Sequence, residues 1–307
     1  MVTEKIKATV DILMATYNGE SHVEDQIFSI LSQSFSDFRL LIHDDGSTDN
    51  TVSIIKEIAR SDSRVVLFED HKTFQNPAQN FLHLVQLSDA EFVMFADQDD
   101  IWLNNKIEIM LNEIREKENH SPQIVYSNSY AWSENKGILG KTIFTFPERI
   151  ENFLFLNGGQ HGCMAIFNKQ ALNLMKKWTG ECAMHDHILQ LIGLSMGHVT
   201  YLKSCLMLYR QHEKNVTGKA LLKEFDVKRL AKNRKAPVIC QKHYNAVVKF
   251  SQTYELPESS KEILDIYISL PTLSFFKKIK TVIIWNFGLY DSKLKLLAKI
   301  LVRPFMA

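Results

Sequence analysis

The sequence lacks any uninterrupted apolar run of the roughly 20 residues that a membrane-spanning helix needs. The apolar core of a signal peptide is also absent from its first residues, MVTEKIKATVDILMATYN. These absences argue against an integral membrane protein and against a secreted one. We therefore expect the protein to remain in the cytoplasm.

Cysteine is scarce: the chain has only Cys163, Cys182, Cys205 and Cys240, and no two of them form a CxxC pair. This scatter matches no zinc-binding spacing and no disulfide framework. Reduced thiols are the expected state, as in most cytoplasmic proteins. Internal repeats and low-complexity tracts are absent as well, so the chain reads as an ordinary globular protein.

The charge is unevenly distributed although the formal net charge is only +1. From Lys219 onward there are 17 Lys and Arg against 7 Asp and Glu, whereas the preceding part is net negative. Such asymmetry predicts a basic region that meets an anionic surface. We place a domain boundary near Gly218, with one domain over 1–218 and a basic helical region over 219–307.

Strand and helix patterns alternate along the first hundred residues. Apolar runs typical of buried strands occur in ATVDILMATYN, FRLLIHDDGSTD, RVVLFED and AEFVMFADQDD. Helical patterns lie between them, as in HVEDQIFSILSQS, TVSIIKEIARS and NPAQNFLHLVQLS. This alternation predicts an α/β fold, a mostly parallel sheet with helices on both faces. Ligands bind such sheets beyond the carboxyl ends of the strands.

The later part of the chain has a less regular pattern. A helix follows Asp100, and strands are expected at QIVYSNSYAWS and CMAIFN. We expect irregular structure over 137–160, a helix at HDHILQLIGLSMG and two strand-like runs in HVTYLKSCLMLYRQH. Beyond Lys219 the pattern is helical.

Polar clusters end three of the predicted strands: 16–18, 44–47 and 97–100. The last is Asp97-Gln98-Asp99-Asp100, whose carboxylates repel one another and are costly to desolvate. A hard cation, Mg²⁺ or Mn²⁺, relieves that repulsion and also bridges phosphates. The alternative is a solvated acidic turn that caps the next helix. Trp102 and the other two clusters favour the cation site.

Asp44 and Asp45 end the second strand, followed by Gly46, Ser47 and Thr48. A carboxylate here can accept the imide N–H of a uracil or thymine ring. The alternative is an Asx turn with a helix N-cap, and for Asp44 the two interpretations carry equal weight.

Together the motifs ILMATYN, HDDGSTDNT and FADQDDIW, in this order and spacing, resemble the family-2 glycosyltransferases of the GT-A fold. The bacterial rhamnosyltransferase-like members are the most similar, through DQDDIW followed by LYRQHEKNVTG. The resemblance covers roughly residues 8 to 218. It implies a nucleoside-diphosphate-sugar donor and inversion of the anomeric centre by direct displacement.

The resemblance also implies roles for single residues. The nucleoside pocket would be formed by Ala15, Thr16 and Tyr17, with Asp45 on the base. Asp97 would contact the ribose, and Asp99 would hold the metal on the diphosphate. The sequence departs from many members at His43, where they carry a small residue.

Direct displacement needs a general base on the acceptor hydroxyl. Family members carry it at a helix start, which corresponds to Glu181–His187, and Asp186 is our candidate. Glu181 is the rival base, and helix-dipole complementation is the alternative role. His185 and His187 are two apart on a helix, so they do not face one side and make a poor metal pair.

Tyr209-Arg210-Gln211-His212 is the last site motif. In GT-A enzymes a late His often completes the metal shell, which assigns His212, and Arg210 can pair with diphosphate oxygens. A surface loop with incidental charges is the alternative. Asn80, early in a helix, either reaches the donor or is a plain surface amide.

The C-terminal segments FFKKIKTVIIWNFGLY and SKLKLLAKILVRPF mix lysines with apolar residues. Basic amphipathic segments of this kind lie on anionic membranes, where lipid-linked acceptors are found. We expect Phe275, Phe276, Trp285, Phe287 and Tyr290 to cluster among the lysines. The alternative is a helical subdomain that packs on the catalytic core or on a partner subunit.

These patterns predict an inverting, metal-dependent glycosyltransferase that acts on a polysaccharide or lipid-linked glycan acceptor, with dTDP-rhamnose as the favoured donor. One rival is a nucleotidyltransferase, but ATYNGES lacks the Gly-rich loop and Lys that it would need. Another is a non-catalytic nucleotide- or glycan-binding protein on the same fold. No stacking or recognition motif accompanies the basic charge, so we expect no nucleic-acid partner.

Overall fold

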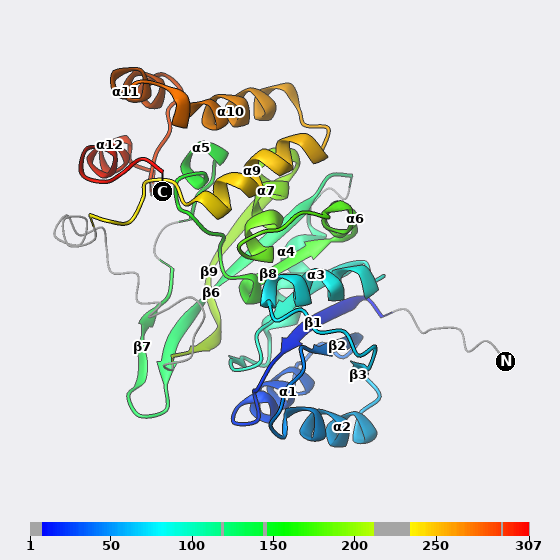
Figure 1. The fold of residues 1–307 in the computed structure, drawn as a ribbon. Coiled ribbons are helices and arrows are strands. Elements are labelled where there is room, and N and C mark those ends of the chain that lie inside the picture. The colour runs from blue at the N-terminus through cyan, green and yellow to red at the C-terminus, as the bar shows by residue number, and fades with distance from the viewer. Residues whose placement is uncertain (1–7, 118–119, 144–145, 212–233, 290, 307) are drawn as a thin grey trace.

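The structure is a computed structural model that describes residues 8–117, 120–143, 146–211, 234–289 and 291–306. Its first part alternates strands and helices as predicted (Figure 1). The elements are β1 (Val10–Thr16), α1 (Val23–Leu31), β2 (Phe38–Asp44), α2 (Thr51–Ser61), β3 (Val65–Phe68), α3 (Pro77–Leu87) and β4 (Phe92–Ala96).

The remaining elements up to residue 210 complete the sheet and its cover. They are β5 (Ile101–Trp102), α4 (Lys106–Arg115), β6 (Gln123–Ser133), β7 (Gly137–Lys141), α5 (Ile150–Phe153), the 3₁₀ turn η1 (Gly162–Met164), β8 (Ala165–Asn168), α6 (Lys169–Lys177), α7 (His185–Met196) and β9 (His198–Arg210). The predicted strand at 123–133 and the predicted helix at 185–197 are confirmed in type. The helix predicted over 101–117 begins only at Lys106, because 101–102 form β5, and the strand predicted over 163–168 begins only at Ala165, after the turn η1.

The strands form one sheet in the order β3-β2-β1-β4-β8-β6-β9-β5, with β7 paired to β6. The pairings among β3, β2, β1 and β4 are parallel. From β4 onward the sheet is mixed: β8 is antiparallel to β4 and β6, and β6 is parallel to β9. A wholly parallel arrangement therefore holds only for these four neighbouring strands, and β6–β9 is a further parallel pair, because the strand-and-helix alternation that enforces parallel crossovers ends at β4.

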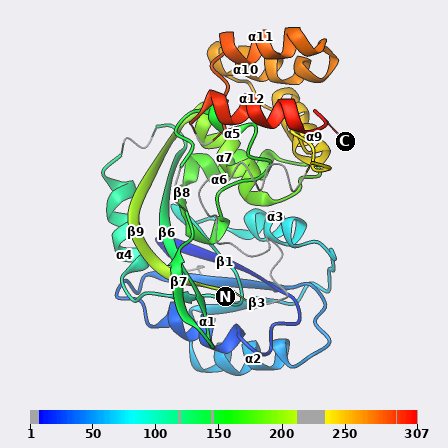
Figure 2. The ribbon, with the colours of Figure 1, turned by 90° about the vertical axis from the view of Figure 1, so that its left-hand side faces the viewer.

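Helices cover both faces of the parallel half. α1 and α2 lie on one side, and α3 and α6 lie on the other, while α7 packs on β6 and β9 of the mixed half (Figure 2). The α1 stripe of Val23, Ile27 and Ile30 is fully buried, which is what its helical spacing predicts. β4 is buried along its whole length, as expected for a strand covered on both faces.

Two local predictions differ from the structure. The region 137–160, predicted to be irregular, contains β7 and the short helix α5. The two strand-like runs at 198–212 form one strand, β9. Its pairing with β6 shifts register around Asn128, so the alternation of buried and exposed positions is interrupted there. That interruption explains why the sequence pattern looked like two strands.

The basic C-terminal region forms α9 (Gln241–Thr253), α10 (Glu258–Ser269), the 3₁₀ turn η2 (Leu270–Thr272), α11 (Phe275–Ile284) and α12 (Lys293–Val302). The predicted domain boundary near residue 218 lies outside the described residues.

This helical region is hydrogen-bonded to α6 and α7 of the preceding part. Tyr254 Oη donates to the Leu174 carbonyl at 2.9 Å, and Ser260 Oγ donates to the Ser195 carbonyl at 2.7 Å. The C-terminal helices thus extend the same apolar core. Within the described ranges, no helix combines the length and the apolar character needed to cross a membrane.

Candidate active site

The loops that follow β1 and β2 are joined by hydrogen bonds. Thr16 Oγ1 donates to Asp44 Oδ2 at 2.8 Å, and Asn18 N donates to Ser47 Oγ at 2.8 Å. Parallel neighbouring strands end side by side, so side chains 28 to 30 positions apart meet at one edge. This edge of the sheet is where the nucleotide site is predicted.

Asp44 is fully engaged in its own turn. Oδ1 accepts from Gly46 N at 3.1 Å and Ser47 N at 2.7 Å, while Oδ2 accepts from Ser47 Oγ and Thr16 Oγ1. Gly46 has a φ of +88°, a conformation that glycine adopts without strain. These contacts are those of an Asx turn, so the structure favours the structural alternative for Asp44.

Asp45 and Asn80 both point into the protein. Asp45 is 6% exposed, and its carboxylate accepts the backbone N–H groups of Phe74 and Asn76. Asn80 is 1% exposed, and its amide nitrogen donates to the His43 carbonyl at 3.1 Å. Asn80 is therefore not the surface amide of the alternative interpretation. Its hydrogen bonds hold α3 against β2.

Gln98 was not assigned a role from the sequence, yet it fixes the end of β1. Its Oε1 accepts from Tyr17 N at 2.9 Å and its Nε2 donates to the Tyr17 carbonyl at 3.0 Å. A Cβ at Gly19 would lie 2.4 Å from Gln98 Oε1, which explains the small residue there. The Tyr17 side chain is left 54% exposed beside the half-buried Ala15.

The carboxylates after β4 lie in a poorly solvated place. Burial, followed by the charge of Asp99, raises the pKa of Asp97 to about 6. The same two causes raise the pKa of Asp100 well above its ordinary value. Asp100 Oδ1 accepts from Arg210 N at 3.0 Å, but Asp100 Oδ2 is buried with no hydrogen-bond partner among the described residues. Clustered carboxylates that repel one another in this way are expected at a cation site.

The donor atoms around these carboxylates suit a hard cation. Asp97 and Asp100 lie with Cys163 in one group whose potential ligand atoms are all within 4.8 Å of one another. Burial raises the pKa of the Cys163 thiol well above its usual range, so it stays protonated and hydrogen-bonds to Asp97. The oxygen ligands that remain fit Mg²⁺ or Mn²⁺. The predicted ligand His212 lies outside the described residues.

Asp186 occupies the first turn of α7 and is 7% exposed. Its Oδ1 atom is buried without a hydrogen-bond partner among the described residues. Burial, and next the charge of Asp97, raise the pKa of Asp186 to about 7. Since Asp97 acts on Asp186 electrostatically, the structure brings the predicted base and the predicted donor-binding carboxylate into one site.

Two glycines let the chain pack against the start of α7. A Cβ at Gly159 would lie 2.7 Å from the Asp186 backbone carbon, and one at Gly162 would lie 2.6 Å from His185 Nε2. His185 stacks on Phe81 with ring centroids 4.0 Å apart, so its ring is part of the core. The rival base Glu181 is exposed and precedes the helix.

Comparison with known proteins fits this geometry. The model of the family described as "Glycosyl transferase family 2" matches residues 11–174, which include the three polar strand ends. The chain belongs to glycosyl transferase family 2.

Curated relatives of this family-2 glycosyltransferase include bacterial proteins. It is 29% identical to the dTDP-rhamnosyl transferase RfbG of Shigella flexneri over 240 residues, which are 71% of this chain and 78% of RfbG. It is 33% identical to the UDP-Glc:alpha-D-GlcNAc-diphosphoundecaprenol beta-1,3-glucosyltransferase WfgD of Escherichia coli over 158 residues, 51% of this chain and 58% of WfgD.

Solved structures share the GT-A fold. S. aureus TarS 1-349 in complex with UDP-GlcNAc has a TM-score of 0.55 and 14% identity, over 90% of this chain and 80% of the TarS chain. The mannosyltransferase PcManGT from Pyrobaculum calidifontis, with GDP-Man and Mn²⁺, has a TM-score of 0.53 and 13% identity, over 97% and 87%.

Arg210 is hydrogen-bonded to the acidic turn of this family-2 site. Its Nε donates to the Asp99 carbonyl at 2.7 Å, its guanidinium pairs with Glu134, and it lies over the Trp132 ring at 4.6 Å. The side chain is 3% exposed. The contacts that the structure gives Arg210 position Asp99 and Asp100, whereas the sequence assigned it to the diphosphate.

Lys106 was missed by the sequence reasoning and lies beside the same carboxylates. It is fully buried, its Nζ donates to the Cys163 carbonyl at 2.5 Å, and it sits 3.6 Å from the centre of the Trp102 ring. Burial lowers the pKa of Lys106 to about 8. A lysine at the start of an amphipathic helix is expected to be exposed to solvent. Only the three-dimensional structure shows that its charge acts on Asp97 and Asp100.

Proposed function

We propose that this protein is an inverting, metal-dependent glycosyltransferase that transfers a sugar, rhamnose from dTDP-rhamnose being the favoured case, to a lipid-linked or polysaccharide glycan. The observation that carries the proposal is Asp186. Its buried Oδ1 atom, which has no hydrogen-bond partner among the residues that the structure describes, and its pKa of about 7 suit a carboxylate that accepts a proton at neutral pH. A protein that only bound glycans would gain nothing from this costly burial.

The carboxylates Asp97, Asp99 and Asp100 would hold Mg²⁺ or Mn²⁺ in this proposal. The cation, when bound, neutralises charge on the donor diphosphate. The buried Asp100 Oδ2 atom, which has no hydrogen-bond partner in the described structure, supports this assignment. Lys106 and the backbone-anchored Arg210 keep the acidic turn in place.

Asp186 would act on the acceptor. An acceptor hydroxyl oxygen forms the new bond to the anomeric carbon while the bond from that carbon to the diphosphate oxygen breaks. The hydroxyl proton passes to Asp186, and the nucleoside diphosphate leaves with the bonding electron pair. Attack opposite the leaving group inverts the anomeric centre.

The donor nucleoside would lie against Ala15, Thr16 and Tyr17, with the exposed Tyr17 ring available to the base. Asp45 holds the loop that contains Phe74 and would shape the base pocket. We assign Asp44 and Asn80 to positioning this pocket, because their polar atoms are used inside the fold. The likeness to a dTDP-rhamnosyl transferase supports thymidine as the nucleoside.

The C-terminal helices would place the site at an anionic membrane. α11 exposes Phe276 (83%) and Ile284 (64%), and the neighbouring α12 exposes Leu294 (78%) and Leu301 (67%). Exposed lysines flank this apolar surface at Lys277, Lys280 and Lys293. An apolar face edged by lysines suits the boundary between lipid headgroups and acyl chains. The name of WfgD, with its diphosphoundecaprenol acceptor, supports a lipid-linked substrate.

Not every tail residue of the sequence prediction belongs to that surface. Phe287 is fully buried and packs against Phe155 and Tyr267, so it does not reach a membrane. Lys299 is buried as well, with its Nζ on the carbonyls of Phe155 and Val238. Tyr290 lies outside the described residues. The region is thus packed on the core with exposed apolar side chains on α11 and α12, and a peripheral location on the cytoplasmic leaflet is our proposal.

The activity test is release of nucleoside diphosphate from a panel of nucleotide sugars with Mn²⁺, with and without a polyprenyl-diphosphate-linked sugar acceptor. We expect acceptor-dependent release from dTDP-rhamnose in wild type and its loss in Asp186→Asn. Release that is the same in the variant as in wild type would contradict the proposal.

Co-sedimentation with liposomes tests the membrane surface. Binding to anionic vesicles should weaken at high salt and in a Phe276→Glu, Leu294→Glu double variant. Lys261→Glu, on the exposed side of α10, is the matched control, because it makes the charge more negative by the same two units without changing an apolar side chain. Equal sedimentation of the double variant and wild type would reject this assignment.

A further inference from the structure

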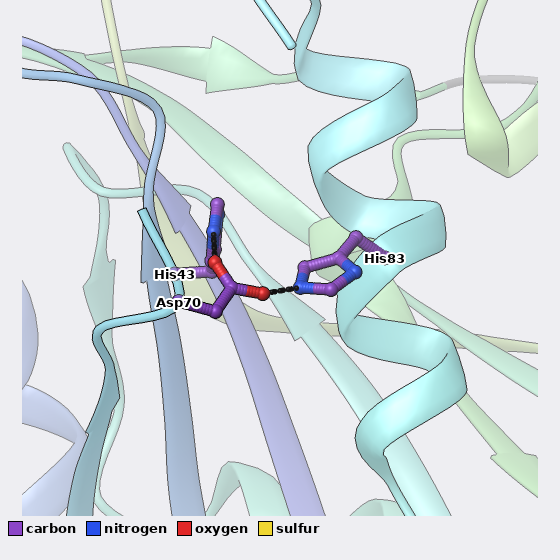
Figure 3. A group of neighbouring side chains, drawn as sticks. All are labelled: His43, Asp70 and His83. Carbon is purple, nitrogen blue, oxygen red and sulfur yellow. Dashed lines mark hydrogen bonds and ion pairs between the residues drawn. The ribbon is translucent and has the colours of Figure 1, made fainter. Parts of the chain in front are cut away.

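Three side chains that are distant in sequence meet at the carboxyl ends of β2 and β3, close to the loop that follows β2. His43 lies in β2, Asp70 follows β3 and His83 lies on α3. Figure 3 shows the Asp70 carboxylate between the two imidazole rings. His43 Nε2 lies 3.0 Å from Asp70 Oδ1, and His83 Nε2 lies 2.7 Å from Asp70 Oδ2. The three potential ligand atoms are all within 4.8 Å of one another.

Asn80 fixes the protonation of the His43 ring. The Asn80 amide nitrogen donates to the His43 carbonyl, so the amide oxygen is the atom that faces His43 Nδ1 at 2.7 Å. An amide oxygen only accepts, and His43 Nδ1 must therefore carry a proton. In the neutral ring, Nε2 then points a lone pair at the Asp70 carboxylate, which is also an acceptor. A proton shared between the two groups, or a cation bound between them, would relieve this close contact of two acceptors at a histidine that is 1% exposed.

The same arrangement is the usual one for a metal-binding histidine. Such residues donate the N–H of one ring nitrogen to an oxygen and bind the metal through the other. Two imidazoles and one carboxylate suit Zn²⁺ and similar transition metals, whereas Mg²⁺ prefers oxygen ligands. Ligand atoms of a tetrahedral zinc ion lie about 3.3 Å apart, so small side-chain movements would complete the site.

The cluster is partly open to solvent, and one lysine beside it would compete with a metal ion for Asp70. The Asp70 side chain is 32% exposed, which leaves a coordination position open to solvent. Phe74 contacts both imidazole rings, with centroids 5.7 and 5.3 Å away. Lys72 Nζ lies 3.4 Å from Asp70 Oδ2, but the lysine is 57% exposed and can move into solvent.

We propose that His43, Asp70 and His83 form a binding site for a divalent transition-metal ion of the zinc class, separate from the carboxylates after β4. The bound ion would join β2, the segment after β3 and α3. Asp45 holds the same segment through the backbone of Phe74 and Asn76. The ion would therefore stabilise the loop beside the predicted base pocket.

Cobalt spectroscopy on the full chain tests the site. Chelator-treated protein, with excess Mg²⁺ to fill oxygen-ligand sites, is titrated with Co²⁺ and then with Zn²⁺. We expect a strong visible absorption of tetrahedral type that Zn²⁺ displaces, and a melting temperature that rises with Zn²⁺. Asp70→Asn and His83→Gln should weaken Co²⁺ binding by roughly 10- to 100-fold or more.

Matched variants separate this site from others. His71→Gln removes an exposed histidine next to Asp70, and Asp99→Ala changes the acidic turn after β4; both should keep the cobalt spectrum. Circular dichroism of each metal-free variant checks the fold, and the partly exposed Asp70 offers a mild substitution if His83→Gln is unstable. Absence of the spectrum in wild type, its retention in a folded Asp70→Asn variant, or its loss in Asp99→Ala would overturn the proposal.

Discussion

Replacement of Asp186 by Asn should stabilise the protein and abolish transfer. The side chain is 7% exposed, and burial raises its pKa from the ordinary 3.8 to about 7. A carboxyl group with a raised pKa in the folded state favours folding at low pH, and this contribution is lost as the pH rises through the folded-state value. Above pH 7 the native protein therefore carries an ionised group that burial disfavours.

The size of the effect follows from the two pKa values. Their difference corresponds to a loss of about 4 kcal/mol between pH 4 and pH 8. An asparagine cannot ionise, but it also gives up the charge-assisted contacts with the backbone at Gly162 and His187. We expect a net stabilisation of about 2–3 kcal/mol at pH 8 and little change at pH 4. For a chain of this size that is on the order of 5 °C in melting temperature.

The assay is thermal unfolding of wild type and variant from pH 4 to pH 8 with a chelator present. Asp265→Asn, at an exposed position of α10, is the control and should match wild type at every pH. A variant that melts at or below the wild-type temperature at pH 8, or a difference that does not vary with pH, would refute the argument from burial.

Further predictions concern other parts of the site. Asp99→Ala should weaken Mn²⁺-dependent binding of a nucleoside diphosphate in calorimetry, and unchanged affinity would remove Asp99 from the metal site. Gly162→Ala places a Cβ 2.6 Å from His185 Nε2 and should lower the free energy of unfolding by about 1–3 kcal/mol in denaturant. Equal stability would mean that the His185 ring moves aside without cost. Gln98→Ala removes both hydrogen bonds to the Tyr17 backbone and should raise the Kd for nucleotide without changing metal affinity; an unchanged Kd would show that this strand end is held by other contacts.

The sequence predicted the elements that position the site because their signals are local. The helical stripe of α1 and the apolar run of β4 are each contained within one short segment. Asp97 and Asp186 could be assigned from motifs alone, although only the fold shows that their charges interact. The reversal of β8 was not predictable, since pairing direction depends on distant segments.

Contacts between distant residues explain the rest. The burial of Lys106 depends on Cys163 and Met207, which lie far along the chain. Likewise, the sequence pattern at Asn80 is that of any helical amide, and its partner His43 lies 37 positions earlier.

Phe287 matches the apolar pattern of the tail as well as Phe276 does. Only its packing against Phe155 and against Tyr267 of α10 separates the buried ring from the exposed one.

The most direct test of the central claim is the anomeric configuration of the transferred sugar. The protein is incubated with Mn²⁺, dTDP-rhamnose and other nucleotide sugars, and a polyprenyl-diphosphate-linked acceptor, and the product is examined by NMR. We predict a product whose anomeric configuration is opposite to that of the donor, formed by wild type and lost by roughly 10²- to 10⁴-fold in Asp186→Asn. A product with the donor configuration, or one formed equally well by the variant, would contradict direct displacement with Asp186 as the base.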